Sequence, residues 1–415
     1  MDDSALPFDP ASLDRLAAVA IRTGLGLREG QDLIITGSAE ALPLVRRIAA
    51  EAYRAGAGLV TPVLTDEAVT LARYREAPDL AFDRAPDWLY QGMAAAYGAN
   101  TARLHIAADN PMALSAEDPA KVSRAARANA RAAKPAMERI TRFETNWTIV
   151  AYPGRAWAQA VFPDLGADAA QKRLADAIFA ASRIDRPDPV SAWAAHNADL
   201  ARRRGWMTAQ GFAALRFRSE GTDLTVGLSE GHEWKGGASE ARNGITCNPN
   251  IPTEEVFTTP HASRVDGRVR ATRPLAHQGS LIEGIEVTFE AGKITEARAA
   301  KGEAVFRELI DTDDGASRLG EVALVPAASP ISESGLLFLN TLFDENAACH
   351  IALGQCYSDC LKDGGKLSKA EVVARGGNQS LIHVDWMIGG PDTDIDGIAA
   401  DGGVTPVFRG GNWAA

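Results

Sequence analysis

His383 and Asp385 interrupt an otherwise apolar stretch near the C-terminus, LIHVDWMIG. In an extended chain, residues two apart lie on the same face, so these two side chains point together while Ile382, Val384 and Trp386 point the other way. An imidazole and a carboxylate on one face form a pair that suits a metal ion. A hydrogen-bonded pair inside a polar core would show the same pattern, so the segment alone leaves both interpretations open.

A second segment, DENAACHIALGQCY, combines His350 and Tyr357 with cysteines. Its small and apolar residues predict a helix over about residues 343–362. At about 100° per residue, His350 and Tyr357 lie on one stripe of that helix. The adjacent stripe holds three cysteines, namely Cys349, Cys356 and Cys360. Recurring cysteine pairs typical of zinc sites are missing, so we interpret the cysteines as core packing. A satisfied core residue remains the alternative for the histidine.

Two further segments place glutamates in or beside strand-like sequence. NIPTEEVFTTP carries Glu254 and Glu255, and at most one of two adjacent side chains can face a site from an extended chain. A solvated surface pair is the simpler interpretation of these two. LGEVALVP carries Glu321 on the same face as Ala323 and Val325, and a carboxylate aligned with a buried face requires a partner.

Together these segments offer three carboxylates and two imidazoles from one half of the chain. The five residues are Glu255, Glu321, His350, His383 and Asp385. Such a set matches a pair of divalent cations about 3.5–4 Å apart, bridged by carboxylate and water. Oxygen ligands with a few nitrogens suit zinc, cobalt or manganese, and the sequence does not choose among them.

The first half of the chain alternates strand-like and helix-like segments. Short apolar runs occur at residues 32–37, 58–64, 102–109 and 146–154, and segments with helical spacing separate them. This rhythm predicts an α/β N-terminal domain with a mainly parallel sheet. The segment GLGLREG precedes the first strand and lacks the G-x-G-x-x-G spacing, so we reject a dinucleotide site.

The second half has a different sequence pattern, with hairpin signals around EGTD and AGK. We predict a mostly β (α+β) C-terminal metal-binding domain whose one prominent helix is the segment over about 343–362. A polar helix over residues 188–206 connects the two halves. The predicted domains are residues 1–204 and 205–415.

The composition excludes several classes of protein. A formal net charge of -11 argues against nucleic-acid and anionic-membrane partners, because phosphates would be repelled. No apolar run approaches the roughly 18 residues that span a bilayer. The acidic N-terminus lacks the features of a signal peptide, which predicts a cytoplasmic protein with its four cysteines reduced.

Four long stretches occur in an order that resembles the aminopeptidase T/aminopeptidase S family, also called thermophilic metalloproteases. These stretches are NPNIPTEEVFTTP, RLGEVALV, NTLFDENAACHIALGQCY and HVDWMIGG. The resemblance covers essentially the whole chain. It implies a metal site of Glu255, Glu321, His350, His383 and Asp385, with Tyr357 at the position of the family's active-site tyrosine.

The resemblance also implies an activity, namely metal-assisted hydrolysis of the N-terminal peptide bond by a metal-bridging water. It implies two divalent metal ions per chain (zinc, cobalt or manganese), short peptide substrates and a homodimer with active sites facing an internal cavity. Glu321 or Glu255 could take the proton of the water, if not fully occupied as a ligand, and Tyr357 would donate to the oxyanion.

Two other classes of function compete with this interpretation. A mononuclear iron ring-cleaving dioxygenase on a related scaffold would use two histidines and one carboxylate, here His350, His383 and Asp385. Glu255 and Glu321 argue against it, because a single iron does not require them. A non-enzymatic binding protein with an inert site is the other class, and the intact set of ligands argues against it.

Overall fold

The computed structural model describes residues 6–277 and 280–414, which form two compact units. Unit 1 comprises Met1–His196 and Ala238–Pro252, and unit 2 comprises Asn197–Gly237 and Thr253–Ala415. The chain therefore enters unit 2, returns to unit 1 for one short segment, and then completes unit 2.

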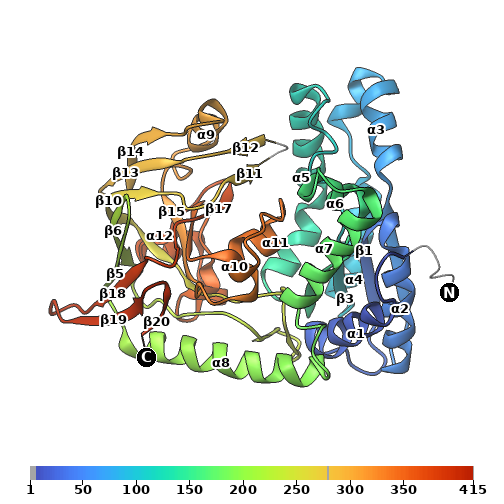
Figure 1. The fold of residues 1–415 in the computed structure, drawn as a ribbon, viewed down its shortest axis with the longest axis horizontal. Helices are drawn as coiled ribbons and strands as arrows, with labels where there is room; N and C mark the ends of the chain where they lie inside the picture. The colour runs from blue at the N-terminus through green and yellow to red at the C-terminus, as the bar shows by residue number, and fades with distance from the viewer. Residues whose placement is uncertain (1–5, 278–279, 415) are drawn as a thin grey trace. The chain divides into compact units, whose positions relative to one another are not determined.

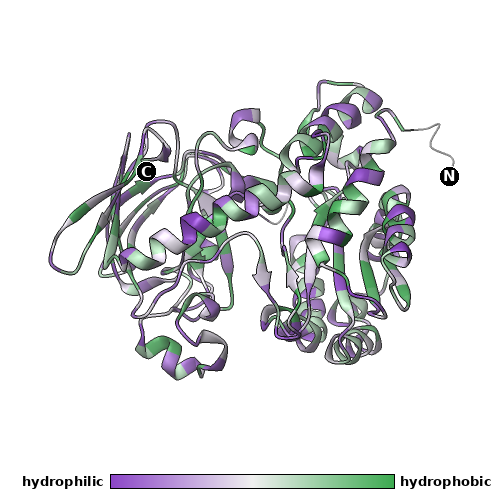
Figure 2. Cartoon of the chain, turned by 90° about the horizontal axis from the view of Figure 1, so that it is seen from below, coloured by the Kyte–Doolittle hydropathy of each residue, from purple (hydrophilic) through white to green (hydrophobic). Residues whose placement is uncertain are grey.

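Unit 1 is built on a four-stranded parallel sheet with the strand order β2-β1-β3-β4. Its strands are β1 (Leu33–Ser38), β2 (Val60–Thr65), β3 (Ala102–Ala107) and β4 (Trp147–Ala151). Central residues such as Leu33, Ile35 and Leu104 are fully buried, as expected for parallel strands covered on both faces. Figure 1 shows β1 and β3 of this sheet among helices, and in Figure 2 green marks the hydrophobic residues of the strands. The predicted α/β domain is confirmed.

Helices precede, connect and follow these strands along the chain. The α-helices are α1 (Ala11–Val19), α2 (Leu42–Arg54), α3 (Glu67–Glu76), α4 (Asp87–Gly98), α5 (Pro119–Thr141), α6 (Arg155–Val161) and α7 (Ala167–Ala181). Short helical turns lie at η1 (Ala20–Leu25), η2 (Ala39–Ala41) and η3 (Asp79–Asp83), and the returning segment adds β7 (Ser239–Glu240) and β8 (Thr246–Cys247). In α2, the buried Leu44, Ile48 and Ala52 recur every four residues, which gives the helix its apolar stripe.

Helix α8 (Pro189–Gln210) leads along the chain into unit 2, whose larger sheet is antiparallel and has eight strands. Its strand order is β14-β13-β10-β6-β5-β18-β19-β20. The strands are β5 (Ala214–Ser219), β6 (Thr222–Leu228), β10 (Pro260–Arg270), β13 (Glu286–Glu290), β14 (Lys293–Arg298), β18 (Asp394–Ile398), β19 (Val404–Arg409) and β20 (Asn412–Trp413). The mostly β C-terminal domain is therefore confirmed.

Both predicted hairpins are present in this sheet. Strands β5 and β6 are joined at Glu220 and Gly221, and β13 and β14 at Ala291 and Gly292. Ala291 and Gly292 have φ angles of 47° and 80°, the left-handed conformation that a two-residue type I′ turn requires.

A second sheet of unit 2 has four strands, β9 (Val256–Thr258), β15 (Leu319–Leu324), β16 (His350–Gly354) and β17 (His383–Met387). Shorter elements complete the unit: β11 (Leu275–His277), β12 (Ser280–Ile282), α9 (Glu303–Ile310), α10 (Pro330–Ser334), α11 (Thr341–Asp344), α12 (Lys369–Ala374), η4 (Glu345–Ala347), η5 (Ser358–Cys360) and η6 (Gly364–Lys366). The two sheets share one apolar core, to which Phe217 and Val226 contribute from one sheet and Val322, Ile351 and Trp386 from the other.

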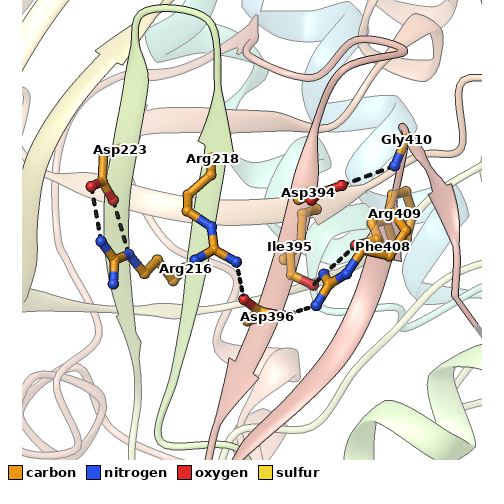
Figure 3. A network of polar contacts seen from close by, with 9 residues as sticks. All are labelled: Arg216, Arg218, Asp223, Asp394, Ile395, Asp396, Phe408, Arg409 and Gly410. Carbon is orange, nitrogen blue, oxygen red and sulfur yellow. Dashed lines mark hydrogen bonds and ion pairs between the residues drawn. The ribbon is translucent and has the colours of Figure 1, made fainter.

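The larger sheet carries a ladder of charged side chains on strands β5, β6, β18 and β19 (Figure 3). Asp396 is 5% exposed and accepts hydrogen bonds from Arg218 and Arg409, while Arg216 and Asp223 form a bidentate pair at 2.9 Å. Charge-assisted bonds of this kind tie neighbouring strands together in a fixed register.

No helix in the described part of the chain is long and apolar enough to cross a membrane. The four cysteines, all within the described residues, are buried and form no disulfide.

Candidate metal centre

The four-stranded sheet of unit 2 carries the candidate residues, and its strands follow the order β17-β16-β15-β9. Every neighbouring pair of strands is antiparallel. Ala352 of the second strand lies opposite Glu321 on one side and opposite Asp385 on the other. Residues that pair across strands share a face, and so do residues two apart on one strand. Glu321, Asp385, His350 and His383 therefore lie on one face of the sheet.

The opposite face of this sheet is apolar and anchors the strands. Val322, Ile351 and Trp386 are each 0% exposed and belong to the core of unit 2. Burial of each such side chain contributes roughly 1.5–3 kcal/mol to stability. Strand β16 lies between β15 and β17 and has Ala352 and Gly354 on the polar face. Their small size leaves room for the longer side chains on either side.

Glu321 presents its two carboxylate oxygens to two different histidines. Its Oε2 lies 3.2 Å from His383 Nε2, and its Oε1 lies 4.0 Å from His350 Nε2. Asp385 Oδ1 lies 3.4 Å from the same nitrogen of His383, and Glu255 Oε2 lies 3.2 Å from the same nitrogen of His350. The five side chains thus form one continuous row with Glu321 at its centre.

Two groups of three residues in this row have the geometry to hold a metal ion. One consists of Glu255, Glu321 and His350, and the other of Glu321, His383 and Asp385. Within each group the available ligand atoms lie within 4.8 Å of one another. Glu321 belongs to both groups, which is the arrangement expected of a carboxylate shared between two ions.

Backbone carbonyls orient both imidazole rings. Nδ1 of His350 lies 3.2 Å from the carbonyl oxygen of Ala348, and Nδ1 of His383 lies 2.7 Å from that of Gln355. When each Nδ1 donates its proton to the carbonyl, Nε2 is left facing the carboxylates. Metal-binding histidines are commonly held by such a bond from the other ring nitrogen.

The crowded charges shift the pKa values of the site. Burial, together with the charges of Asp385 and Glu255, raises the pKa of Glu321 to about 7. Burial acts to lower the pKa of His350, but the hydrogen-bonded Glu255 and the charge of Asp385 raise it to about 10. Burial also acts to lower the pKa of His383, but Asp385 and Glu321 raise it well above its usual value. Protons on the imidazoles offset the negative charge of the carboxylates. A divalent cation replaces such protons when it binds.

Asp385 provides an independent check that the residues fit a cation. Its Oδ1 is buried and makes no hydrogen bond with the described residues, although Nε2 of His383 lies within ion-pair distance at 3.4 Å. A buried carboxylate oxygen without a hydrogen bond is costly unless a cation lies close to it. The donor set of three carboxylates and two imidazoles therefore fits divalent metal ions chemically as well as geometrically.

Glu255, the residue directly before β9, completes the row of side chains. The interpretation of Glu254 and Glu255 as a solvated surface pair is wrong. The two residues are only 5% and 7% exposed. The backbone N–H of Glu254 donates to Oδ1 of Asn346 at 2.7 Å, and Phe257 exchanges two backbone hydrogen bonds with Lys235. These contacts draw the segment inside unit 2, and they join residues far apart in the sequence.

The predicted helix over 343–362 is also wrong, because this segment holds α11, η4, strand β16 and η5. Its central residues are paired with β15 on one side and β17 on the other. Cys349 therefore faces away from His350 because the two are adjacent on an extended chain, not because they occupy different helical stripes. Gly354 has a φ angle of 103°, which is incompatible with a helix.

Tyr357 follows β16 and lies beside the row of ligands. Its ring centroid is 4.7 Å from that of His383 and 5.8 Å from that of Phe257. Although 45% of the residue's surface is exposed, desolvation and the charges of Glu321 and Asp385 raise its pKa well above the usual value. The phenol therefore keeps its proton at neutral pH and can act as a hydrogen-bond donor.

One further carboxylate, which the sequence interpretation missed, shares this neighbourhood. Glu345 lies in η4, five residues before His350, and the charges of Glu255, Asp385 and Glu321 act on it. Burial is the largest cause of the rise of its pKa well above the usual value. The only signal in the sequence was its place inside the stretch NTLFDENAACHIALGQCY.

Comparisons with known proteins all match this chain to one family over nearly its whole length. Residues 10–413 match the family model described as thermophilic metalloprotease (M29). Aminopeptidase T of Thermus thermophilus is 53% identical over 97% of this chain and 98% of that protein. Aminopeptidase AmpS of Bacillus subtilis is 39% identical over the same shares. The solved structure of wild-type AmpT from Thermus thermophilus matches with a TM-score of 0.93 and 51% identity, covering 98% of this chain and 99% of that chain.

Proposed function

The chain belongs to the thermophilic metalloprotease (M29) family and is a metal-dependent aminopeptidase, and from this premise we propose that five of its residues hold two divalent cations. The five are Glu255, Glu321, His350, His383 and Asp385. The observation that carries this proposal is the position of Glu321, whose carboxylate belongs to both groups of potential ligands. One shared carboxylate between two groups is what a pair of neighbouring cations needs.

The chemistry of the donors supports zinc, cobalt or manganese. Carboxylates dominate the set and imidazoles supply the nitrogens, a mixture that these three ions accept. Cysteine does not take part in this proposal. Cys349 lies on the apolar face of β16, and burial raises the pKa of the Cys356 thiol to about 11.

The bound cations would supply a water molecule of lowered pKa and would polarise the carbonyl of the N-terminal peptide bond. Because both oxygens of Glu321 face histidines, we assign this residue to holding the centre and not to proton transfer. Tyr357 lies against His383 with its proton retained, and we propose that its hydroxyl donates a hydrogen bond to the oxyanion that forms at the attacked carbonyl.

We propose short peptides as the substrates, cleaved after the first residue. The relatives named aminopeptidase support this choice, since they remove residues from an amino terminus by name. We further propose that the chain forms a homodimer, as the family resemblance implied, and that it acts in the cytoplasm.

Hydrolysis of aminoacyl-arylamides tests this proposal. Wild-type protein is expected to lose activity with a chelator and to regain it with zinc, cobalt or manganese. In the variant His350→Ala, one group of ligands loses its only nitrogen. Loss of a residue that merely supports a metal ligand costs about 10–100-fold in metal affinity or activity, and loss of the ligand itself should cost about 100-fold or more.

The matched control is Cys356→Ala, on the same segment of the chain. Its thiol packs in a small separate cluster with Leu361 and Val372. This variant is expected to keep its metal content, measured by elemental analysis, and its rate of hydrolysis. Wild-type activity that a chelator leaves unchanged would contradict the proposal.

A further inference from the structure

Glu345 is a carboxylate that stands beside the proposed metal centre without belonging to either group of ligands. It begins the short turn η4 (Glu345–Ala347), which packs against β17, the strand of His383 and Asp385. Glu255 and Glu321 are 7% and 4% exposed, and Glu345 is partly exposed as a residue although its carboxyl group is desolvated. Its position beside β17 places it near the centre.

The neighbouring Asn346 fixes the turn relative to the ligand Glu255. Asn346 is fully buried, and its Oδ1 accepts a hydrogen bond from the N–H of Glu254 at 2.7 Å. Its Nδ2 donates to the carbonyl oxygen of Leu342 at 3.1 Å and lies 3.4 Å from Oε1 of Glu345. A single amide side chain therefore connects Glu345 with the backbone N–H of Glu254, the residue before Glu255.

The remaining capacity of the Glu345 carboxylate is free for another partner. Among the described residues, its one hydrogen bond is the long contact with Asn346. No salt bridge in the described part of the chain involves it, in contrast to Glu255 and Glu321, which both lie within ion-pair distance of histidines. The packing of η4 against β17 and the contact with Asn346 place Glu345 near the strand that carries His383 and Asp385.

We propose that Glu345 is the general base of the reaction, an inference that rests on the proposed metal centre. Bound cations would favour its charged form, and the carboxylate then takes a proton from the attacking water as the water oxygen bonds to the carbonyl carbon. The same proton then passes to the nitrogen of the leaving peptide as the carbon–nitrogen bond breaks, so that the carboxylate returns to its starting state. A base must not be consumed as a ligand, and Glu345, which belongs to neither group of ligands, meets this condition better than Glu321 or Glu255.

The variant Glu345→Gln tests this role, because the amide keeps the shape of the side chain but cannot accept the proton. General base catalysis contributes typically 10²–10⁴-fold, so kcat is expected to fall by about that factor. We expect KM within about threefold of wild type and two bound ions per chain. Glu345→Asp, which keeps the carboxylate on a shorter chain, should recover part of kcat. The control Glu333→Gln makes the same chemical change at an exposed position of α10 and should leave both constants unchanged.

Three results would overturn the assignment. Activity of Glu345→Gln within threefold of wild type would exclude a base at this position. A loss that appears in KM alone would assign Glu345 to binding of the substrate's ammonium group. Loss of one metal ion would make it a ligand. Failure of the proposed function is separate, since wild-type protein would then hydrolyse its substrate without metal.

Discussion

Glu321→Gln is expected to remove nearly all activity, with a fall in kcat/KM of about 10³-fold or more. Glu321 is the one residue shared by both groups of ligands, and each of its oxygens faces a different histidine. An amide offers one neutral oxygen and places an N–H donor where the second oxygen stood, so it cannot serve two cations. Loss of a supporting residue alone costs about 10–100-fold, and the loss of a shared ligand must exceed this. Elemental analysis should find fewer than two ions per chain.

The same substitution should leave the metal-free fold intact, which separates a catalytic from a structural effect. Burial raises the pKa of Glu321 to about 7, so the carboxylate is costly in its charged form. Glutamine matches the protonated form of this carboxyl group in shape and charge, and His383 keeps Asp385 as an acidic partner at 3.4 Å. The free energy of unfolding of the metal-free variant should stay within about 1 kcal/mol of wild type. The control Glu296→Gln, exposed on strand β14, should keep full activity. An active Glu321→Gln variant with two bound ions would contradict the assignment.

Tyr357→Phe is expected to lower kcat by about 10²–10³-fold with little change in KM, as for removal of one donor to an oxyanion. The ring contacts with His383 and Phe257 survive the substitution, since they do not involve the hydroxyl. The hydroxyl makes no hydrogen bond with the described residues and is therefore available to substrate. Metal content should not change, because phenylalanine alters none of the five ligands.

The control for the hydroxyl is Tyr90→Phe in unit 1. Tyr90 donates a hydrogen bond to Oδ1 of Asn129 at 2.6 Å, so the control also removes a tyrosine hydroxyl, here one that is hydrogen-bonded within unit 1. Its steady-state constants should match wild type. If Tyr357→Phe kept wild-type kcat, stabilisation of the oxyanion would have to come from elsewhere in the site.

Several parts of the fold could be predicted because their signals are local. The strand of His383 and Asp385 alternates apolar and polar residues, and period-two alternation specifies which side chains share a face. The turns at Gly221 and Gly292 use glycine at positive φ angles, and turn chemistry of this kind lies within a few residues. The buried strands of unit 1 were short apolar runs between helical segments, typical of a parallel sheet.

Strand β16 could not be predicted in the same way. Its sequence, HIALG, consists of small and apolar residues whose intrinsic preference does not exclude a helix. The strand forms because β15 and β17 both pair with it, and such tertiary contacts override local preference. The alternation of Cys349, Ile351 and Leu353 toward the core was present in the sequence but agrees with a helical pattern over so short a length.

The position of the segment that carries Glu255 depends on contacts with residues distant in the sequence. Asn346 holds the backbone of Glu254 across 92 positions of the chain and also contacts the side chain of Glu345. No local pattern in PTEEV distinguishes a buried glutamate pair from a solvated one. For the same reason, Glu345 could be recognised as part of the site only once β16 and η4 were placed beside β17.

Metal reconstitution of the wild-type protein tests the central claim most directly. Chelator-treated protein is titrated with zinc, cobalt or manganese, and bound ions are counted by elemental analysis while hydrolysis of an aminoacyl-arylamide is followed. The two groups of ligands that share Glu321 predict that full activity is reached at two ions per chain. Full activity with a single bound ion, or with iron as the one metal, would contradict the account.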